Sequence, residues 1–158
     1  MISVKVTGGS KWKDVLKKIA DQKLSVKVGV LGGRYSGRYG TNPDTYIAQV
    51  AAALEFGTSK MAARKPFRTS ISLKQTSWLN LFRRLMTGHP DRVKNALSIL
   101  GEKMAKDIQV VIKDNLLQPP DKESTVKEKE RMGLQPSNVT GLRTGEFMSS
   151  IASEVVKI

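Results

Sequence analysis

The sequence predicts an α+β fold in which helices pack a small, mainly antiparallel sheet, with one long helix and extended loops. Apolar and polar residues alternate over 24–30, as in a half-buried strand. Apolar residues recur at spacings of three and four over about 90–116, as in a long amphipathic helix. Polar segments at 32–43 and 117–140 separate the predicted elements. A length of 158 residues predicts a single domain over 1–158.

Two more elements are predicted before residue 24. Alternation over 2–6 predicts a first strand, and Ser10 is a favourable cap for the amphipathic helix that follows. The strand over 24–30 then leads into the loop at 32–43. Because this loop and 117–140 contain little apolar material to bury, we expect both to be mobile.

The next helix is predicted to begin at Asn42. Asn is a good cap, Pro43 suits the first helical position, and the macrodipole favours the acidic Asp44 in the first turn. Gly57 is expected to end this helix. Residues 58–68 lack periodicity and predict an arm or connector.

The remaining helices are predicted from the spacing of apolar residues and from the residues that start or end a helix. In the arm, Pro66 is expected to hold Lys65 extended. Helical spacing then returns over 70–86 and again over 90–116. A short charged helix is predicted over 124–131, capped by Ser124. The sequence further predicts a turn at 144–145 and a last strand over 151–158.

The positive charge is unevenly distributed. The formal net charge is +13, with 9 Lys and Arg against 2 Asp and Glu in 1–40, 7 against 2 in 41–88, and 11 against 10 in 89–158. Such a surplus attracts polyanions within a Debye length, about 8 Å in physiological salt. The charge therefore indicates an anionic partner, unless the lysines only keep the protein soluble.

The sequence gives little support for catalysis. Without cysteine it has no thiolate nucleophile, thiolate metal site or disulfide, and the phosphate-binding pattern GxxxxGK[ST] is missing. His89, before Pro90 in a predicted interhelical turn, is more typical of a cap or a solvated residue than of a base. Asp107 and Asp114 form a weak candidate acid–base pair on the long helix. We expect no enzyme activity, no catalytic or metal site and no cofactor, and no membrane partner because no apolar run approaches about 20 residues.

Four motifs between residues 24 and 158 together carry a resemblance. They are Val28-Gly29-Val30, Ala53-Leu54-Glu55-Phe56-Gly57-Thr58, Ala63-Arg64-Lys65-Pro66-Phe67-Arg68 and Thr144-Gly145-Glu146-Phe147-Met148-Ser149-Ser150-Ile151. In this order they resemble the tail-completion (neck, head-to-tail joining) proteins of tailed bacteriophages, whose pattern near the carboxyl end is Thr-Gly-x-(Leu/Phe)-x-x-Ser-Ile. Two departures are Lys65, which interrupts the usual Ala-Arg-Pro-Phe, and Gly141-Leu142-Arg143 in place of a more apolar lead.

The resemblance implies a structural protein of the virion neck or tail end, made in the host bacterial cytoplasm. Such a subunit forms a homo-oligomeric ring, expected to be a hexamer, that completes the tail and joins it to the head connector around the DNA channel. The expected partners are neighbouring connector and tail-tube proteins, with transient, non-specific contact to genomic DNA.

A closed ring uses two different patches of each subunit. The segment 63–68 suits one patch, and the turn at 55–57 suits the other or supports the arm from within. Alternatively, Phe56 and Phe67 are ordinary core residues. The candidate subunit-interface or connector-docking residues are Glu55, Phe56, Gly57, Arg64, Pro66, Phe67 and Arg68.

The loop at 32–43 interleaves Arg34 and Arg38 with Tyr35 and Tyr39. It either faces DNA or docks on protein; we favour docking, because a channel through which DNA slides should not hold it tightly. The alternative function is a basic nucleic-acid-binding protein that holds single strands through this loop. A further candidate is the carboxyl-terminal turn, with Thr144, Gly145, Phe147 and Ile151.

Overall fold

The computed structural model describes residues 23–34, 36, 42–87, 92–134 and 145–158, with Asp14, Lys17 and Asp21. These three isolated residues are helical. The predicted strand over 2–6 and the rest of the predicted first helix lie outside the described residues, as do Tyr35, Arg38, Tyr39, His89 and Thr144.

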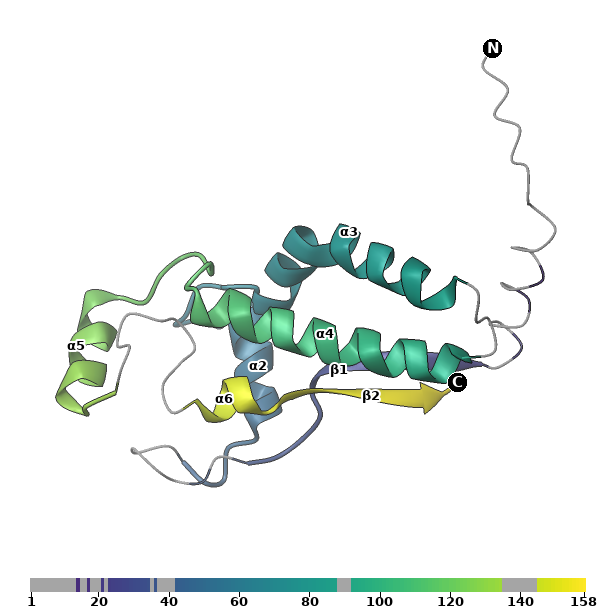
Figure 1. Cartoon of the computed structure of the whole chain (residues 1–158). Helices are drawn as coiled ribbons and strands as arrows, with labels where there is room; N and C mark the ends of the chain where they lie inside the picture. The colour runs from purple at the N-terminus through teal and green to yellow at the C-terminus, as the bar shows by residue number, and fades with distance from the viewer. Residues whose placement is uncertain are drawn as a thin grey trace, which may run out of the picture.

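The fold is α+β, as predicted, with a two-stranded antiparallel sheet and helices packed on it (Figure 1). The elements are β1 (Leu24–Val30), α2 (Ile47–Phe56), α3 (Pro66–Met86), α4 (Val93–Lys113), α5 (Glu123–Arg131), α6 (Glu146–Ser149) and β2 (Ile151–Lys157). In the sheet, Leu24 lies opposite Lys157 and Val30 opposite Ile151. Helix α4 packs on the sheet, and α3 packs on α4.

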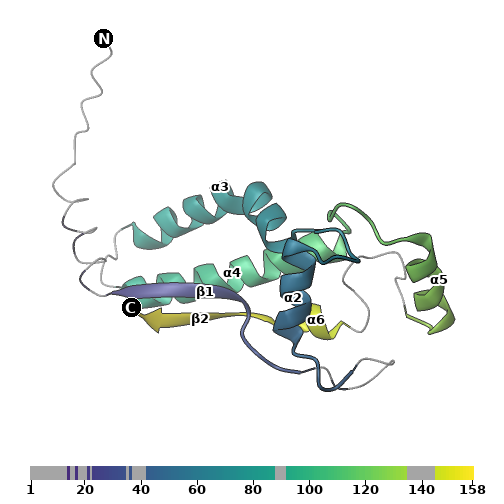
Figure 2. The same ribbon diagram turned by 180° about the vertical axis from the view of Figure 1, so that it is seen from behind.

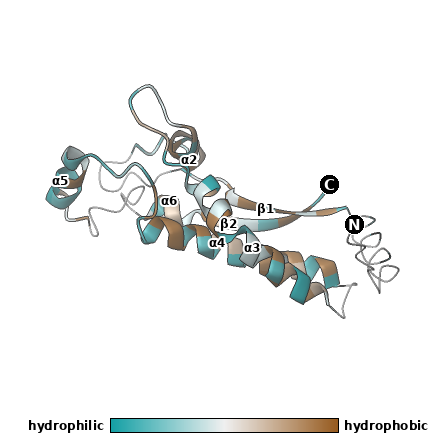
Figure 3. Ribbon diagram, turned by 90° about the horizontal axis from the view of Figure 1, so that it is seen from above, coloured by the Kyte–Doolittle hydropathy of each residue, from teal (hydrophilic) through white to brown (hydrophobic). Residues whose placement is uncertain are grey.

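Helix α4 organises the layers, as its long apolar stripe predicts. Its ribbon alternates between apolar and polar residues, whereas α5 is mostly hydrophilic (Figure 3). Helix α2 lies beside one end of the sheet, and α5 lies beyond it (Figure 2). No helix within the described residues is long and apolar enough to cross a membrane.

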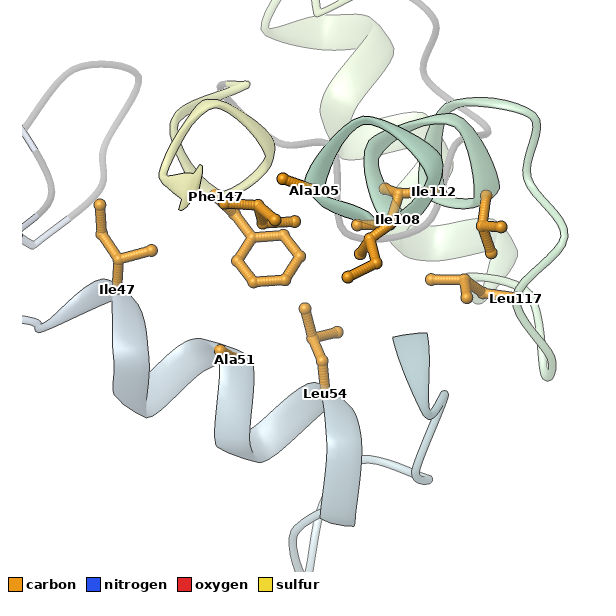
Figure 4. Packing of buried hydrophobic residues seen from close by; sticks show 10 residues of the cluster. Ile47, Ala51, Leu54, Ala105, Ile108, Ile112, Leu117 and Phe147 are labelled. Atoms are coloured by element: carbon orange, nitrogen blue, oxygen red, sulfur yellow. The ribbon is translucent and has the colours of Figure 1, made fainter. Parts of the chain in front are cut away.

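The main core lies between α2, α4 and α6. Side chains of α2 point toward Phe147 of α6 and toward α4 (Figure 4). The buried residues of this cluster are Ile47, Ala51, Leu54, Ala105, Ile108, Val111, Ile112, Leu117, Phe147 and Ile151. A second, smaller cluster of Met86, Val93 and Ala96 closes the other end, with Leu24, Phe82, Leu85 and Leu97 packed against it.

Helix α2 begins at Ile47, later than the predicted start at Asn42. The Asn42 side chain instead accepts the amide of Asp44 at 2.9 Å, and its carbonyl accepts the amide of Thr45 at 3.0 Å, which closes a turn. Tyr46 then pairs with Arg34 in an isolated bridge. Since residues up to Tyr46 are paired with the segment that follows β1, helix α2 can start only after Tyr46.

Helix α3 begins at Pro66, so the end of the predicted arm is its first turn. Lys65 is left-handed, with φ 56°, and not extended as predicted. Proline disfavours the right-handed helical region for the preceding residue, and Lys65 avoids that region by adopting the left-handed one. The N-cap residue of the short helix α5 is Lys122 and not Ser124 as predicted. The Lys122 side chain makes no capping hydrogen bond.

Gly101 permits the close approach of α4 to the sheet. A Cβ at this position would lie 2.7 Å from a methyl of Val26 and 2.8 Å from the Cβ of Ser153. Both distances are shorter than real Cβ contacts. The Cβ of Ser153 is fixed to the backbone of β2, so it can move away only if the strand itself moves. The α4–sheet packing therefore requires glycine here.

Replacing Gly101 with Val should push α4 away from the sheet and lower the free energy of unfolding by about 2 kcal/mol. Urea unfolding followed by circular dichroism measures this. The control is Glu102→Val at the next, exposed position, which we expect to change stability by less than about 0.5 kcal/mol. Equal stability of the two variants would show that the α4–sheet contact is not tight.

Candidate docking surface at the α2–α3 corner

The corner between α2 and α3 is a hydrogen-bonded turn. Gly57 has φ +80°, and a Cβ there would lie 2.9 Å from the amide nitrogen of Ala63. The carbonyl of Leu54 accepts the amides of both Arg64, at 2.8 Å, and Lys65, at 3.0 Å. The segment without periodicity is thus folded back onto the end of α2.

The carboxylate of Glu55 fixes the start of α3. It is buried, and it accepts the backbone amides of Phe67 at 3.0 Å and Arg68 at 3.4 Å. Arg68 Nε also lies 2.9 Å from Glu55 Oε1. Because Pro66 has no amide hydrogen, Glu55 serves the first two donors of the helix and places a negative charge at its positive end. The turn therefore supports the segment from within, one of the two roles considered above.

Arg64 belongs to a buried ionic cluster. Its Nη2 lies 3.0 Å from Asp121 Oδ1, and Lys129 Nζ lies 2.6 Å from Asp121 Oδ2, with all three side chains buried. Arg64 Nε also donates to the carbonyl of Pro119 at 3.2 Å. Arg64 therefore anchors the segment that leads into α5 and is not free to meet a partner.

Phe56 and Arg68 are the candidates that face solvent. The Phe56 residue is 71% exposed, and the guanidinium of Arg68 lies 5.1 Å from the centre of its ring. Ile71, one turn further along α3, is 49% exposed. We call these three residues the corner patch. By contrast, Pro66 is buried and Phe67 is half-buried against the main core.

A second pair of arginine and aromatic side chains lies before α2. The guanidinium of Arg34 is 4.5 Å from the ring centre of Tyr46 and donates to its hydroxyl at 2.7 Å. Asp44 lies 3.9 Å from the same guanidinium. The sequence prediction missed Tyr46, which was read as part of a helix. The loop is also tied to α6, because the amide of Ser36 donates to Glu146 at 2.9 Å.

The described part of the carboxyl-terminal turn is structural. Gly145 has φ +76°, while Phe147 and Ile151 are core residues. Gln109 of α4 donates to the carbonyls of Met148 and Ile151, both at 3.2 Å. These contacts join α6 and the start of β2 to α4 and leave no role in docking for the two apolar side chains.

Asp107 lies between α3 and α4. Its carboxylate accepts the indole N–H of Trp78 at 2.8 Å and pairs with Lys103. Burial alone would raise the pKa of Asp107, but the hydrogen bonds from Lys103 and Trp78 and the nearby charges outweigh it, so the pKa lies below its ordinary value of 3.8. Asp114 is exposed at the end of α4. Asp107 is thus held ionised, unlike a general acid.

Within the described ranges, no group of three or more His, Asp or Glu side chains could hold a metal ion. Comparisons with protein-family models, with curated proteins and with solved structures gave no significant match for this chain.

Replacing Glu55 with Gln should lower the free energy of unfolding by about 1–2 kcal/mol, because the cap of α3 loses its charge and its ion pair. Chemical denaturation measures the change. Exposed Glu102→Gln is the control and should stay within about 0.5 kcal/mol of the parent. A Glu55 variant as stable as the control would mean that the carboxylate does not hold the corner.

Replacing Asp107 with Asn should destabilise the protein at about pH 7 and much less at about pH 3. A carboxylate whose pKa is lowered by folding stabilises the protein above its unfolded pKa, and this stabilisation is lost as the pH falls through the lower folded pKa. Urea unfolding at both pH values gives the difference. Replacing the exposed Asp114 with Asn serves as control. If the loss of stability in the Asp107 variant is the same at both pH values, folding does not lower the pKa of Asp107.

Proposed function

We propose that this chain is a structural protein of the neck or tail end of a tailed-phage virion. Its subunits form a ring that completes the tail and joins it to the head connector around the DNA channel. Two lines support the proposal: the ordered motifs between 24 and 158, and an exposed aromatic–arginine surface on a rigid corner.

The corner patch is the observation that carries the proposal. Aromatic and arginine side chains contribute most to binding at protein interfaces, and Phe56 is exposed although it ends an otherwise core-forming helix. The Glu55 carboxylate already holds Arg68 over the ring of Phe56. A partner would therefore meet an ordered surface and lose little side-chain entropy on binding.

A ring also needs a second, different patch, and the Arg34–Tyr46 pair suits it. Tyr46 immediately precedes α2 and Phe56 is its last residue, so about 15 Å of helix separates the two aromatic positions. Each position has its own arginine partner. Two separate surfaces at opposite ends of one helix are what a head-to-tail contact between identical subunits requires.

Replacing Phe56 with Ala should reduce assembly of the oligomeric ring at least tenfold. Thermal stability should not change, because the phenyl group that is removed lies on the exposed surface and not in the core. Light scattering after size-exclusion chromatography and electron microscopy measure assembly. In phage lacking the native gene, the variant should fail to join heads to tails.

The control is Leu79→Ala, which removes an apolar side chain that is 57% exposed on α3, thirteen residues beyond Pro66. It should assemble like the parent. If the parent forms neither rings nor complexes with connector protein, or if the Phe56 variant joins heads to tails normally, the proposed function is wrong.

A further inference from the structure

Six exposed basic residues belong to chain segments that meet at the end of the molecule opposite α5. The tertiary structure brings together the end of α3, the start of α4 and the outer end of the sheet (Figures 1 and 2). Leu24 packs against the cluster that joins the two helices, and Ile158 donates its amide to the carbonyl of Lys23 at 2.6 Å. The six residues, which we call the basic end, are Lys23, Arg83, Arg84, Arg92, Lys94 and Lys157.

The charges of the basic end have no ion-pair partner within the described residues, including the exposed Asp21 two residues before Lys23. All six residues are exposed, and none of the ion pairs between described residues includes any of them. Helix α3 contains no acidic residue. Asp91 adjoins Arg92 in the sequence but lies outside the described residues. A surface of this kind produces a positive potential that attracts anions.

The start of α4, which carries two of these six residues, adds the positive end of its helix dipole to this surface. Arg92 is its N-cap residue and Lys94 lies in its first turn, where no acidic residue is present. No side chain caps the helix there. Cations at the positive end of a helix dipole are unfavourable, and an anion placed there would relieve the repulsion.

We propose that the basic end binds the phosphate backbone of double-stranded DNA without reading its sequence. Several separate cations suit a regularly charged polyanion, and backbone contacts of this type give sequence-independent binding. Among the described aromatic residues near the basic end, Trp78 is buried and Phe82 half-buried, so neither offers a free ring face on which an unpaired base could stack, and this favours duplex over single strands.

An acidic protein is the less favoured partner. Protein interfaces have an apolar centre depleted of charge. The large apolar side chains exposed elsewhere, such as Phe56, Leu73 and Leu116, lie outside the basic end, where Ile158 is the exposed large apolar residue. The inference also differs from the Arg/Tyr-loop alternative, since Arg34 is already engaged by Tyr46 and Asp44. It rests on the proposed function, which implies transient contact with genomic DNA, and deepens it by naming the surface that makes this contact; its test does not require ring formation.

The test measures binding of a fluorescent duplex of about 24 base pairs by anisotropy, at about 50 to 200 mM salt. The parent should lose affinity steeply as salt rises. The triple variant Arg83→Gln/Arg84→Gln/Lys94→Gln should bind at least tenfold more weakly at about 100 mM salt, and the magnitude of its log–log salt slope should fall by about 2 to 3.

The control variant Lys60→Gln/Lys113→Gln/Lys122→Gln removes the same charge from exposed positions outside the basic end. The affinity of this control variant for the duplex should fall by less than threefold. A second test variant, Lys94→Gln/Lys157→Gln, leaves α3 intact and should also lose more affinity than the control, so a folding defect in α3 cannot decide the result.

Three outcomes would overturn the proposal. They are no binding by the parent, equal loss in the test and control triple variants, or tighter binding of a single strand or of polyglutamate than of the duplex. Each can occur whether or not the protein forms rings, so failure here is distinguishable from failure of the proposed function.

Discussion

The buried carboxylate of Glu55 is the interaction on which the arrangement of the helices depends. It satisfies the first backbone donors of α3 and so fixes where that helix starts and in which direction it leaves α2. That direction determines how α3 packs on α4, which in turn covers the sheet. The same carboxylate orients Arg68 against Phe56. One side chain therefore links the core to the surface that we propose for docking.

The second electrostatic constraint is the cluster of Arg64, Asp121 and Lys129. Two cations share one carboxylate in a buried site, so the cluster is costly to desolvate and contributes less to net stability than its short distances suggest. Its clearer effect is on geometry, because Arg64 joins a polar segment to a corner more than fifty residues earlier. Apolar packing alone gives little direction to α5, whose sequence is almost entirely polar.

Periodicity predicted the α+β class, both described strands and the four longer helices, because the core faces of α2 and α4 follow helical spacing; the four-residue helix α6 was not predicted. The start of α3 was missed because its cap comes from Glu55, eleven residues before Pro66, and no local pattern encodes such a contact. The residues of the Ala63–Arg68 motif indicated an interface, yet Arg64 and Pro66 are buried. The basic end could not be predicted, because its residues are spread from Lys23 to Lys157.

The length of α2 is constrained from both ends. Inserting a single residue would turn everything beyond it by about 100° around the axis. Glu55 would then swing away from the amides it accepts, while Phe56 would leave its arginine and lose its fixed orientation relative to Tyr46. Lineages of this protein could therefore exchange many individual side chains of α2, whereas the number of residues between its two aromatic positions should resist change.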